Sequence, residues 1–163
     1  SWVQSINPVF ILALSGVFAA LWTKWGTKQP STPVKMGLGT IVMGIAFLLF
    51  LTVYNAAPHT APLLALVAIL FVFTIAELLI SPVSLSVSTK LAPTAFRTQM
   101  VALLFLSSAL GTAMSGQLAG LYDEKHPELN FDYFAYSGLA AIGLGIVLLL
   151  IRKWVLKLME GVC

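Results

Sequence analysis

The sequence predicts an all-α membrane protein with five transmembrane helices. Of its 163 residues, 59% are hydrophobic and only 9% are charged, whereas about a quarter of the residues of a soluble domain carry a charge. Several apolar runs reach about 20 residues, which is long enough to cross the hydrocarbon core of a bilayer. Inside that core no water is present to bond the backbone, so each crossing segment must be a helix.

Five segments satisfy this length requirement, and short breaks separate them. The breaks contain glycine, proline and polar residues, which are typical of turns. Because the linkers are short, we expect consecutive helices to be antiparallel neighbours. The predicted helices cover, approximately, residues 4–25, 35–55, 61–88, 97–122 and 133–158, and together they make one partial helical bundle over residues 1–163.

Basic residues distinguish the two sides of the predicted membrane protein. Of the nine lysine and arginine residues, all except Lys125 lie on the side reached after the first, third and fifth segments. An excess of basic residues marks the cytoplasmic side. We therefore expect a multi-pass protein of the cell membrane, with its N-terminus outside and its C-terminus in the cytoplasm. Aromatic residues near both rims agree with this placement: Trp2, Trp22, Trp25, Tyr54, Tyr122, Tyr133, Tyr136 and Trp154.

Composition also excludes several classes of partner and activity. The net charge is only +3, and the basic residues lie in loops on one side, so membrane orientation explains them better than nucleic-acid binding. Cys163 is the single cysteine, which leaves no disulfide within the chain and no metal-ligand cluster. No nucleophile–base set or phosphate-binding glycine loop is present. We therefore expect a protein that contacts membrane lipid, is not an enzyme, and needs neither cofactor nor metal.

Glu77 is the first candidate site residue, because it is the only acidic residue inside the long apolar segments. A charged side chain at the centre of a bilayer helix costs about 3 kcal/mol by insertion scales, and such residues mark ion or substrate sites. A carboxyl group in this position can hold a proton or bind a cationic amine. The alternative is a neutral glutamate that hydrogen-bonds to a neighbouring helix.

Ser81 and Pro82 follow Glu77 in the same segment. Proline has no N–H group, so the carbonyl of Leu78 loses its helical partner and the helix can kink there. Ser81 begins a run of serines that is polar enough to line a wet path. We therefore expect Ser81 to contribute to the binding site and Pro82 to contribute to gating.

Asn7 and Pro8 form a second candidate site. Asn7 lies 17 residues from Lys24, and Glu77 lies 13 residues from Lys90. At 1.5 Å per residue, both positions are about 20–25 Å from the cytoplasmic ends of their helices, so they can share one cavity. An asparagine amide can donate and accept hydrogen bonds there. The alternative is that Asn7 only caps the start of a helix, because asparagine followed by proline is a common helix start. The spacing alone favours neither interpretation.

The remaining motifs have structural interpretations. Small residues recur every four positions in the fourth segment and end in Gly116 and Gly120, a GxxxG pattern that permits close contact between helices. Lys90 and Arg97 flank a short loop that contains no acidic residue. We interpret these two cations as orienting charges, with a gating ion pair as the alternative.

Three stretches resemble the proton-dependent oligopeptide transporter family of the major facilitator superfamily. They are residues 4–14 (QSINPVFILAL), 76–93 (AELLISPVSLSVSTKLAP) and 105–120 (FLSSALGTAMSGQLAG). The middle stretch is the most specific, because it combines an intramembrane glutamate, a Ser-Pro pair and a Thr-Lys-Leu-Ala-Pro ending. The match extends over nearly the whole chain, which resembles the eighth to twelfth helices of a twelve-helix carrier.

This resemblance implies a function and a set of partners. The chain is expected to be part of the C-terminal six-helix bundle of a major facilitator fold, with a small peptide and a proton as substrates and the N-terminal half of the transporter as its partner. Glu77 matches the glutamate that meets the amine of a bound peptide, and Asn7 matches an asparagine in the same pocket. Two positions depart from the family, because Leu104 stands where tryptophan is usual and Thr112 where asparagine is frequent.

The leading hypothesis is therefore the C-terminal portion of a proton-coupled di- and tripeptide symporter. One alternative is a carrier of another small solute, such as nitrate or a drug-like molecule. Another is a non-transporting scaffold subunit that pairs through the small residues of the fourth segment.

Overall fold

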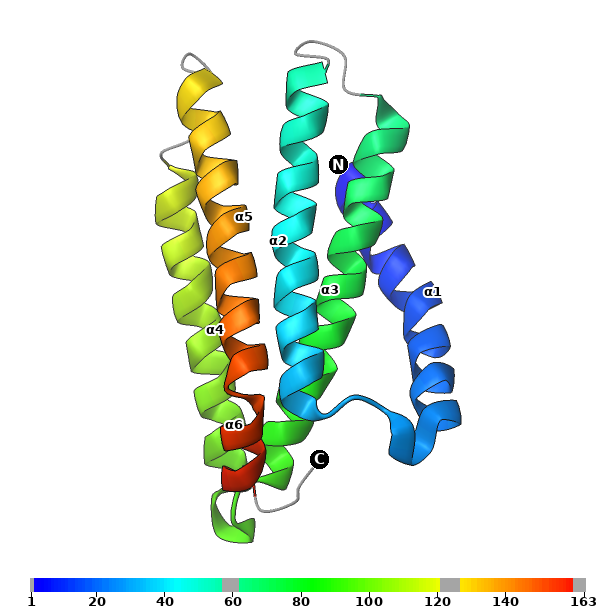
Figure 1. Cartoon of the computed structure of the whole chain (residues 1–163), viewed down its shortest axis with the longest axis vertical. Coiled ribbons are helices and arrows are strands. Elements are labelled where there is room, and N and C mark those ends of the chain that lie inside the picture. Colours follow the sequence, from blue (N-terminus) through cyan, green and yellow to red (C-terminus); the bar gives the residue numbers. More distant parts are fainter. Residues whose placement is uncertain (1, 57–61, 121–126, 160–163) are drawn as a thin grey trace.

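The computed structural model describes residues 2–56, 62–120 and 127–159, which form long helices and no β-strand (Figure 1). Five of these helices are long and apolar enough to cross a membrane. The long helices are α1 (Trp2–Trp25), α2 (Thr32–Ala56), α3 (Leu63–Lys90), α4 (Arg97–Ala119) and α5 (Pro127–Leu150), and the short ones are η1 (Gly26–Lys28), η2 (Thr94–Phe96) and α6 (Arg152–Leu158).

Helix α2 is the central helix of the bundle, with α5 against one face and α3 against another. Helix α1 packs on α3, and α4 packs on α3 alone among the long helices described. The expectation that all consecutive helices are neighbours is therefore wrong for two pairs, since within the described residues the α1 and α2 backbones do not pack together, nor do those of α4 and α5. For α1 and α2, the reason is that α2 packs closely against α3 and α5, while α1 packs against α3.

The contact between α2 and α5 depends on glycines that the sequence analysis did not single out. A Cβ atom added at Gly44 would lie 2.6 Å from the carbonyl oxygen of Gly138, and one added at Gly145 would lie 2.8 Å from that of Gly37. No real Cβ atom tolerates such distances, so only glycine permits the two backbones to approach this closely. The two glycine pairs therefore hold α5 directly against α2.

Small and aromatic residues complete the centre of the bundle. Ala46 of α2 and Ala76 of α3 are fully buried. Next to Ala46, the Phe47 ring makes an edge contact with Phe73 of α3, and its centroid lies 6.2 Å from that of the Phe134 ring on α5. Such aromatic pairs stabilise packing by about 0.5–1.5 kcal/mol beyond their buried area. This core joins α2, α3 and α5 and positions the face of α3 that carries Glu77.

The predicted fifth segment, 133–158, differs from the helices observed. Helix α5 begins earlier, at Pro127, and proline is a common residue at the first position of a helix. It ends at Leu150, and after Ile151 the chain forms the separate helix α6. The break precedes Arg152 and Lys153, whose charges favour the membrane–water interface over the hydrocarbon.

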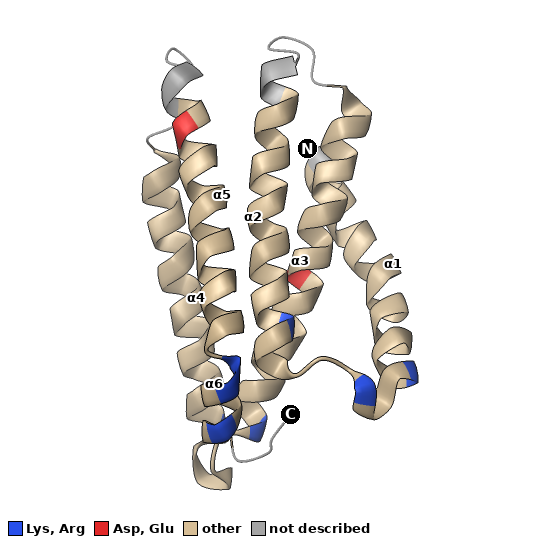
Figure 2. Cartoon of the chain, in the orientation of Figure 1, with Lys and Arg blue, Asp and Glu red and all other residues tan. Residues whose placement is uncertain are grey.

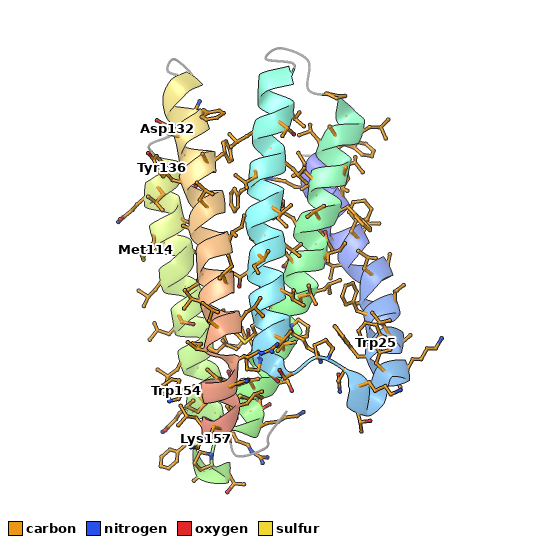
Figure 3. All side chains as sticks on the ribbon, in the orientation of Figure 1. Trp25, Met114, Asp132, Tyr136, Trp154 and Lys157 are labelled. Carbon is orange, nitrogen blue, oxygen red and sulfur yellow. The ribbon has the colours of Figure 1, made fainter. Side chains whose placement is uncertain are left out.

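Charged and aromatic residues are sorted along the long axis of the bundle. Figure 2 shows the described lysine and arginine residues gathered at one end, with an acidic position at the opposite end. Figure 3 places Trp25, Trp154 and Lys157 toward the basic end, and Asp132 and Tyr136 toward the other. Trp154 and Tyr136 are 64% and 71% exposed, as expected for residues at the two rims of a membrane. Lys125, Asp123, Glu124 and Tyr122 lie outside the described residues.

Candidate functional site

Helix α1 meets α3 along one face, and Asn7 lies on that face. Asn7 is well inside α1, which begins at Trp2, so its side chain does not cap the helix start. Pro8 likewise lies inside α1 instead of at its first position. One turn further along, the rings of Phe10 and Phe71 meet edge to face, with centroids 5.6 Å apart. This aromatic contact joins α1 and α3 beside Asn7.

Asn7 connects two polar side chains of α3. Its amide nitrogen Nδ2 donates to Oε2 of Glu77 at 3.4 Å, and its oxygen Oδ1 accepts from the Thr74 hydroxyl at 2.7 Å. The predicted proximity of Asn7 and Glu77 is therefore present in the structure. Because hydrocarbon provides no alternative partners, this chain of polar groups links the two helices at that depth.

Helical spacing on α3 explains why these groups share one face. Residues three, four and seven positions apart lie along the same side of a helix. Thr74, Glu77 and Ser81 follow this spacing, and α3 continues as one helix through Pro82 up to Lys90. Thr74 is fully buried, Glu77 is half-buried and Ser81 is exposed. The polar face of α3 thus passes from the packed interior to an open surface.

A cavity of about 400 Å³ lies between α1 and α3 beside this face. Its volume falls within the range of about 300–1,000 Å³ that is usual for small-ligand pockets. Glu77 is the only ionisable residue among its lining residues, which otherwise combine apolar groups with two serines: Ile11, Ser15, Phe18, Ala19, Trp22, Leu78, Ser81 and Pro82. A single carboxyl group in a mainly apolar cavity is suited to bind one cationic group.

The carboxyl group of Glu77 is engaged on one side and open on another. Its hydrogen bond with Asn7, on the neighbouring helix α1, involves Oε2. The contact agrees with the alternative of a glutamate bonded to a neighbour, but the same residue also lines the cavity. A carboxylate has about four acceptor positions, so one amide leaves room for a further donor.

A second cavity, of about 790 Å³, lies nearer the basic end and shares Trp22 and Pro82 with the first. Lys35 and Lys90 both line it. The Lys35 ammonium group lies 4.3 Å from the centroid of the Trp22 ring and donates to Gln29 at 2.8 Å. Pro82 therefore stands at the boundary between a nearly uncharged cavity and a basic one.

The serines after Glu77 divide into two kinds. Ser81 and Ser86 line the first and second cavities. Ser84 and Ser88 instead donate to carbonyl oxygens of their own helix, at Ile80 and Ser84. Only part of the predicted serine run therefore borders a cavity.

The two glycines of the α4 GxxxG pattern make no close contact with another helix among the described residues. A Cβ atom at Gly116 would meet nothing within 4 Å. One at Gly120 would meet only the carbonyl oxygens of Gln117 and Gly116, which belong to the end of the same helix. Thr112 is exposed and donates to the carbonyl of Ser108. The described part of the chain therefore does not bring Gly116 or Gly120 to the site, and the close contacts predicted for them occur instead at the glycines of α2 and α5.

Sequence reasoning missed three residues that build the site. Thr74 anchors Asn7, while Ser15 and Trp22 of α1 line the cavity. The positions of Ser15 and Trp22, eight and fifteen residues after Asn7, place them on its face of the helix. Thr74 precedes Glu77 by three positions, a spacing that also indicated proximity.

Comparisons with known proteins agree with the motifs and the fold. A sequence model of the POT family matches residues 1–136. The di-/tripeptide transporter of Lactococcus lactis subsp. cremoris is 43% identical over 164 residues, which cover 99% of this chain and 32% of that protein. The uncharacterized transporter YclF of Bacillus subtilis (strain 168) is also 43% identical, with the same coverage. The chain therefore spans about a third of the length of the curated relatives it matches.

Solved structures match the arrangement of the helices. The crystal structure of peptide transporter POT in complex with sulfate superimposes with a TM-score of 0.84 at 40% identity, covering 97% of this chain and 32% of that one. A POT family transporter in complex with a thioalcohol-conjugated peptide gives 0.83 at 34% identity, covering 92% and 30%. The predicted fold, a partial bundle of a major facilitator transporter, is confirmed by these matches, and the chain belongs to the POT family, the proton-dependent oligopeptide transporters.

Proposed function

We propose that this chain forms the C-terminal part of a proton-coupled di- and tripeptide symporter and provides one wall of its peptide-binding cavity. The observation that carries the proposal is the Asn7–Glu77 hydrogen bond beside a cavity of about 400 Å³. The names of its relatives support a peptide as substrate, since one at 43% identity is a di-/tripeptide transporter. The partner in this proposal is the remaining two thirds of the transporter.

In this proposal the ammonium group of a bound peptide pairs with the Glu77 carboxylate. A hydrogen bond between charged groups is worth about 1.5–3 kcal/mol, more than a neutral one. The apolar residues around Glu77 exclude competing water, which strengthens that attraction. Asn7 holds the carboxylate, Ser81 lies on the same cavity wall, and Pro82 stands where gating would connect the two cavities.

Replacement of Glu77 by glutamine in the full-length transporter tests this proposal. We expect uptake of labelled dialanine into proteoliposomes, driven by an inward proton gradient, to fall about tenfold or more, because the charged hydrogen bond is lost. Asp132→Asn is the matched control, since it removes the same charge from an exposed position on α5. Wild-type uptake by the Glu77→Gln variant would refute the binding role of Glu77.

Competition experiments distinguish peptide transport from carriage of another solute. If the substrate is a peptide, excess unlabelled dialanine suppresses the uptake, whereas free alanine and nitrate at the same concentration do not. Suppression by nitrate or alanine alone would favour the alternative carrier.

We also propose that the basic end of the bundle faces the cytoplasm, which places the N-terminus of this chain outside. The end-to-end separation of charges in Figure 2 supports this orientation. A cysteine introduced at Lys28 or at Asp132, in a cysteine-free full-length background, provides the test. We expect a membrane-impermeant maleimide added to intact cells to label the Asp132→Cys variant and not the Lys28→Cys variant. The reverse pattern would contradict the proposed orientation.

A further inference from the structure

We propose that Thr74 is a positioning residue, whose hydroxyl group fixes the Asn7 amide with its NH₂ group toward Glu77. The inference rests on the proposed function, since it concerns how the same cavity is prepared for a peptide amine. Thr74 does not line the cavity, so it acts on a substrate only through Asn7.

The burial of Thr74 and the partners of its hydroxyl make this role specific. Its side chain is 0% exposed, the largest side chain in the described residues to be fully buried. The oxygen Oγ1 lies 2.8 Å from the carbonyl oxygen of Leu70 and 2.7 Å from Oδ1 of Asn7. A buried threonine can satisfy its hydroxyl within its own helix through such a carbonyl. The hydroxyl has one proton, so it donates to only one of these two acceptors at a time, and the shorter contact, to Oδ1 of Asn7, is the one that joins the two helices.

The two ends of the Asn7 amide differ chemically, and the Thr74 hydroxyl together with the Glu77 carboxylate favours one orientation. The hydroxyl donates to Oδ1, which leaves Nδ2 as the group directed at Oε2 of Glu77. If the amide were turned over, Oδ1 would face an ionised carboxylate, and two acceptors would repel each other. The observed orientation is thus the one in which each of the three groups meets a complementary partner.

The two hydrogen bonds of Asn7 are unequal in length, and the difference suits a binding site. The bond from Thr74 is short, at 2.7 Å, whereas the bond to Glu77 is long, at 3.4 Å. Hydrogen bonds from nitrogen are usually about 2.7–3.2 Å long, so the contact with Glu77 is loose. Thr74 therefore holds the Asn7 amide in place, while the Glu77 carboxylate can still accept a hydrogen bond from an ammonium group.

Two substitutions of Thr74 in the full-length transporter separate the hydroxyl from the shape of the side chain. Valine matches the volume without the hydroxyl, and serine keeps the hydroxyl with less volume. For proton-driven dialanine uptake into proteoliposomes, we expect Thr74→Val to raise KM about three- to tenfold with little change in Vmax, as for the loss of one oriented hydrogen bond. Thr74→Ser should restore a KM within about twofold of the wild type. If Thr74→Val does not fold, Thr74→Ala removes the same hydroxyl without a branched side chain.

A double-mutant cycle with Asn7→Ala shows whether Thr74 acts through Asn7. We expect Thr74→Val to have no further effect on KM in the Asn7→Ala background, and the two substitutions to be non-additive in thermal unfolding. A KM unchanged by Thr74→Val, equal effects of Val and Ser, or additive effects in both measurements would overturn the positioning role. If the wild type takes up no dialanine, the proposed function fails, and the unfolding cycle alone then decides whether Thr74 holds Asn7.

Discussion

Two interfaces of the bundle use opposite means to hold helices together. Between α2 and α5, glycine pairs let the backbones touch, with a hypothetical Cβ of Gly44 only 2.6 Å from the carbonyl of Gly138. Between α1 and α3, the link is a chain of polar side chains from Thr74 through Asn7 to Glu77, with an open cavity beside it. At these glycines the first interface brings two backbones into contact, whereas the second borders a cavity.

The difference shows where this fold can tolerate movement. Backbone contact through glycine has one fitting register, because a shift by one position would bring a larger side chain against the opposite helix. A polar contact at 3.4 Å beside a cavity can lengthen or exchange partners at low cost. We therefore expect the α2–α5 interface to contribute mainly to stability, and we propose that the α1–α3 interface contributes mainly to binding.

The largest effect on stability is expected from a methyl group placed in the α2–α5 interface. Gly145→Ala would bring its Cβ within 2.8 Å of the Gly37 carbonyl oxygen and 3.0 Å of the Ile41 amide nitrogen, both backbone atoms. Because backbone cannot move aside as a side chain does, we expect a destabilisation of about 1–3 kcal/mol, as in other overpacked interiors. Thermal unfolding of the full-length protein in detergent provides the measurement.

Gly143→Ala is the matched control on the same helix. A Cβ atom at Gly143 meets nothing within 4 Å, so alanine there should be neutral or slightly stabilising through its higher helix propensity. If Gly145→Ala unfolds at the same temperature as Gly143→Ala, the glycine pairs do not secure α5, and the contrast between the two interfaces disappears.

The two interfaces also differ in how far they could be predicted from sequence. Glu77 was identifiable because a lone acid in an apolar segment is chemically conspicuous, and its depth relative to Asn7 followed from the helical rise. Which helices pack together could not be predicted in the same way, because short linkers do not determine which faces of α2 contact other helices. Gly44 and Gly138 make close contact because they face each other across two helices, and the sequence does not show this pairing. Taken singly, neither could be distinguished from the exposed Gly116.

The smallest expected effect distinguishes two serines one turn apart on α3. Ser81 lines the cavity beside Glu77, whereas Ser84 donates to the Ile80 carbonyl of its own helix at 2.8 Å. We expect Ser81→Ala to raise the KM for dialanine about two- to fivefold, which corresponds to one neutral hydrogen bond. Ser84→Ala should leave KM within about twofold of the wild type, and neither variant should change the unfolding temperature appreciably. Equal KM shifts from both serines would show that substrate affinity depends on the α3 backbone as a whole, and binding would then not be confined to the face that α3 presents to α1.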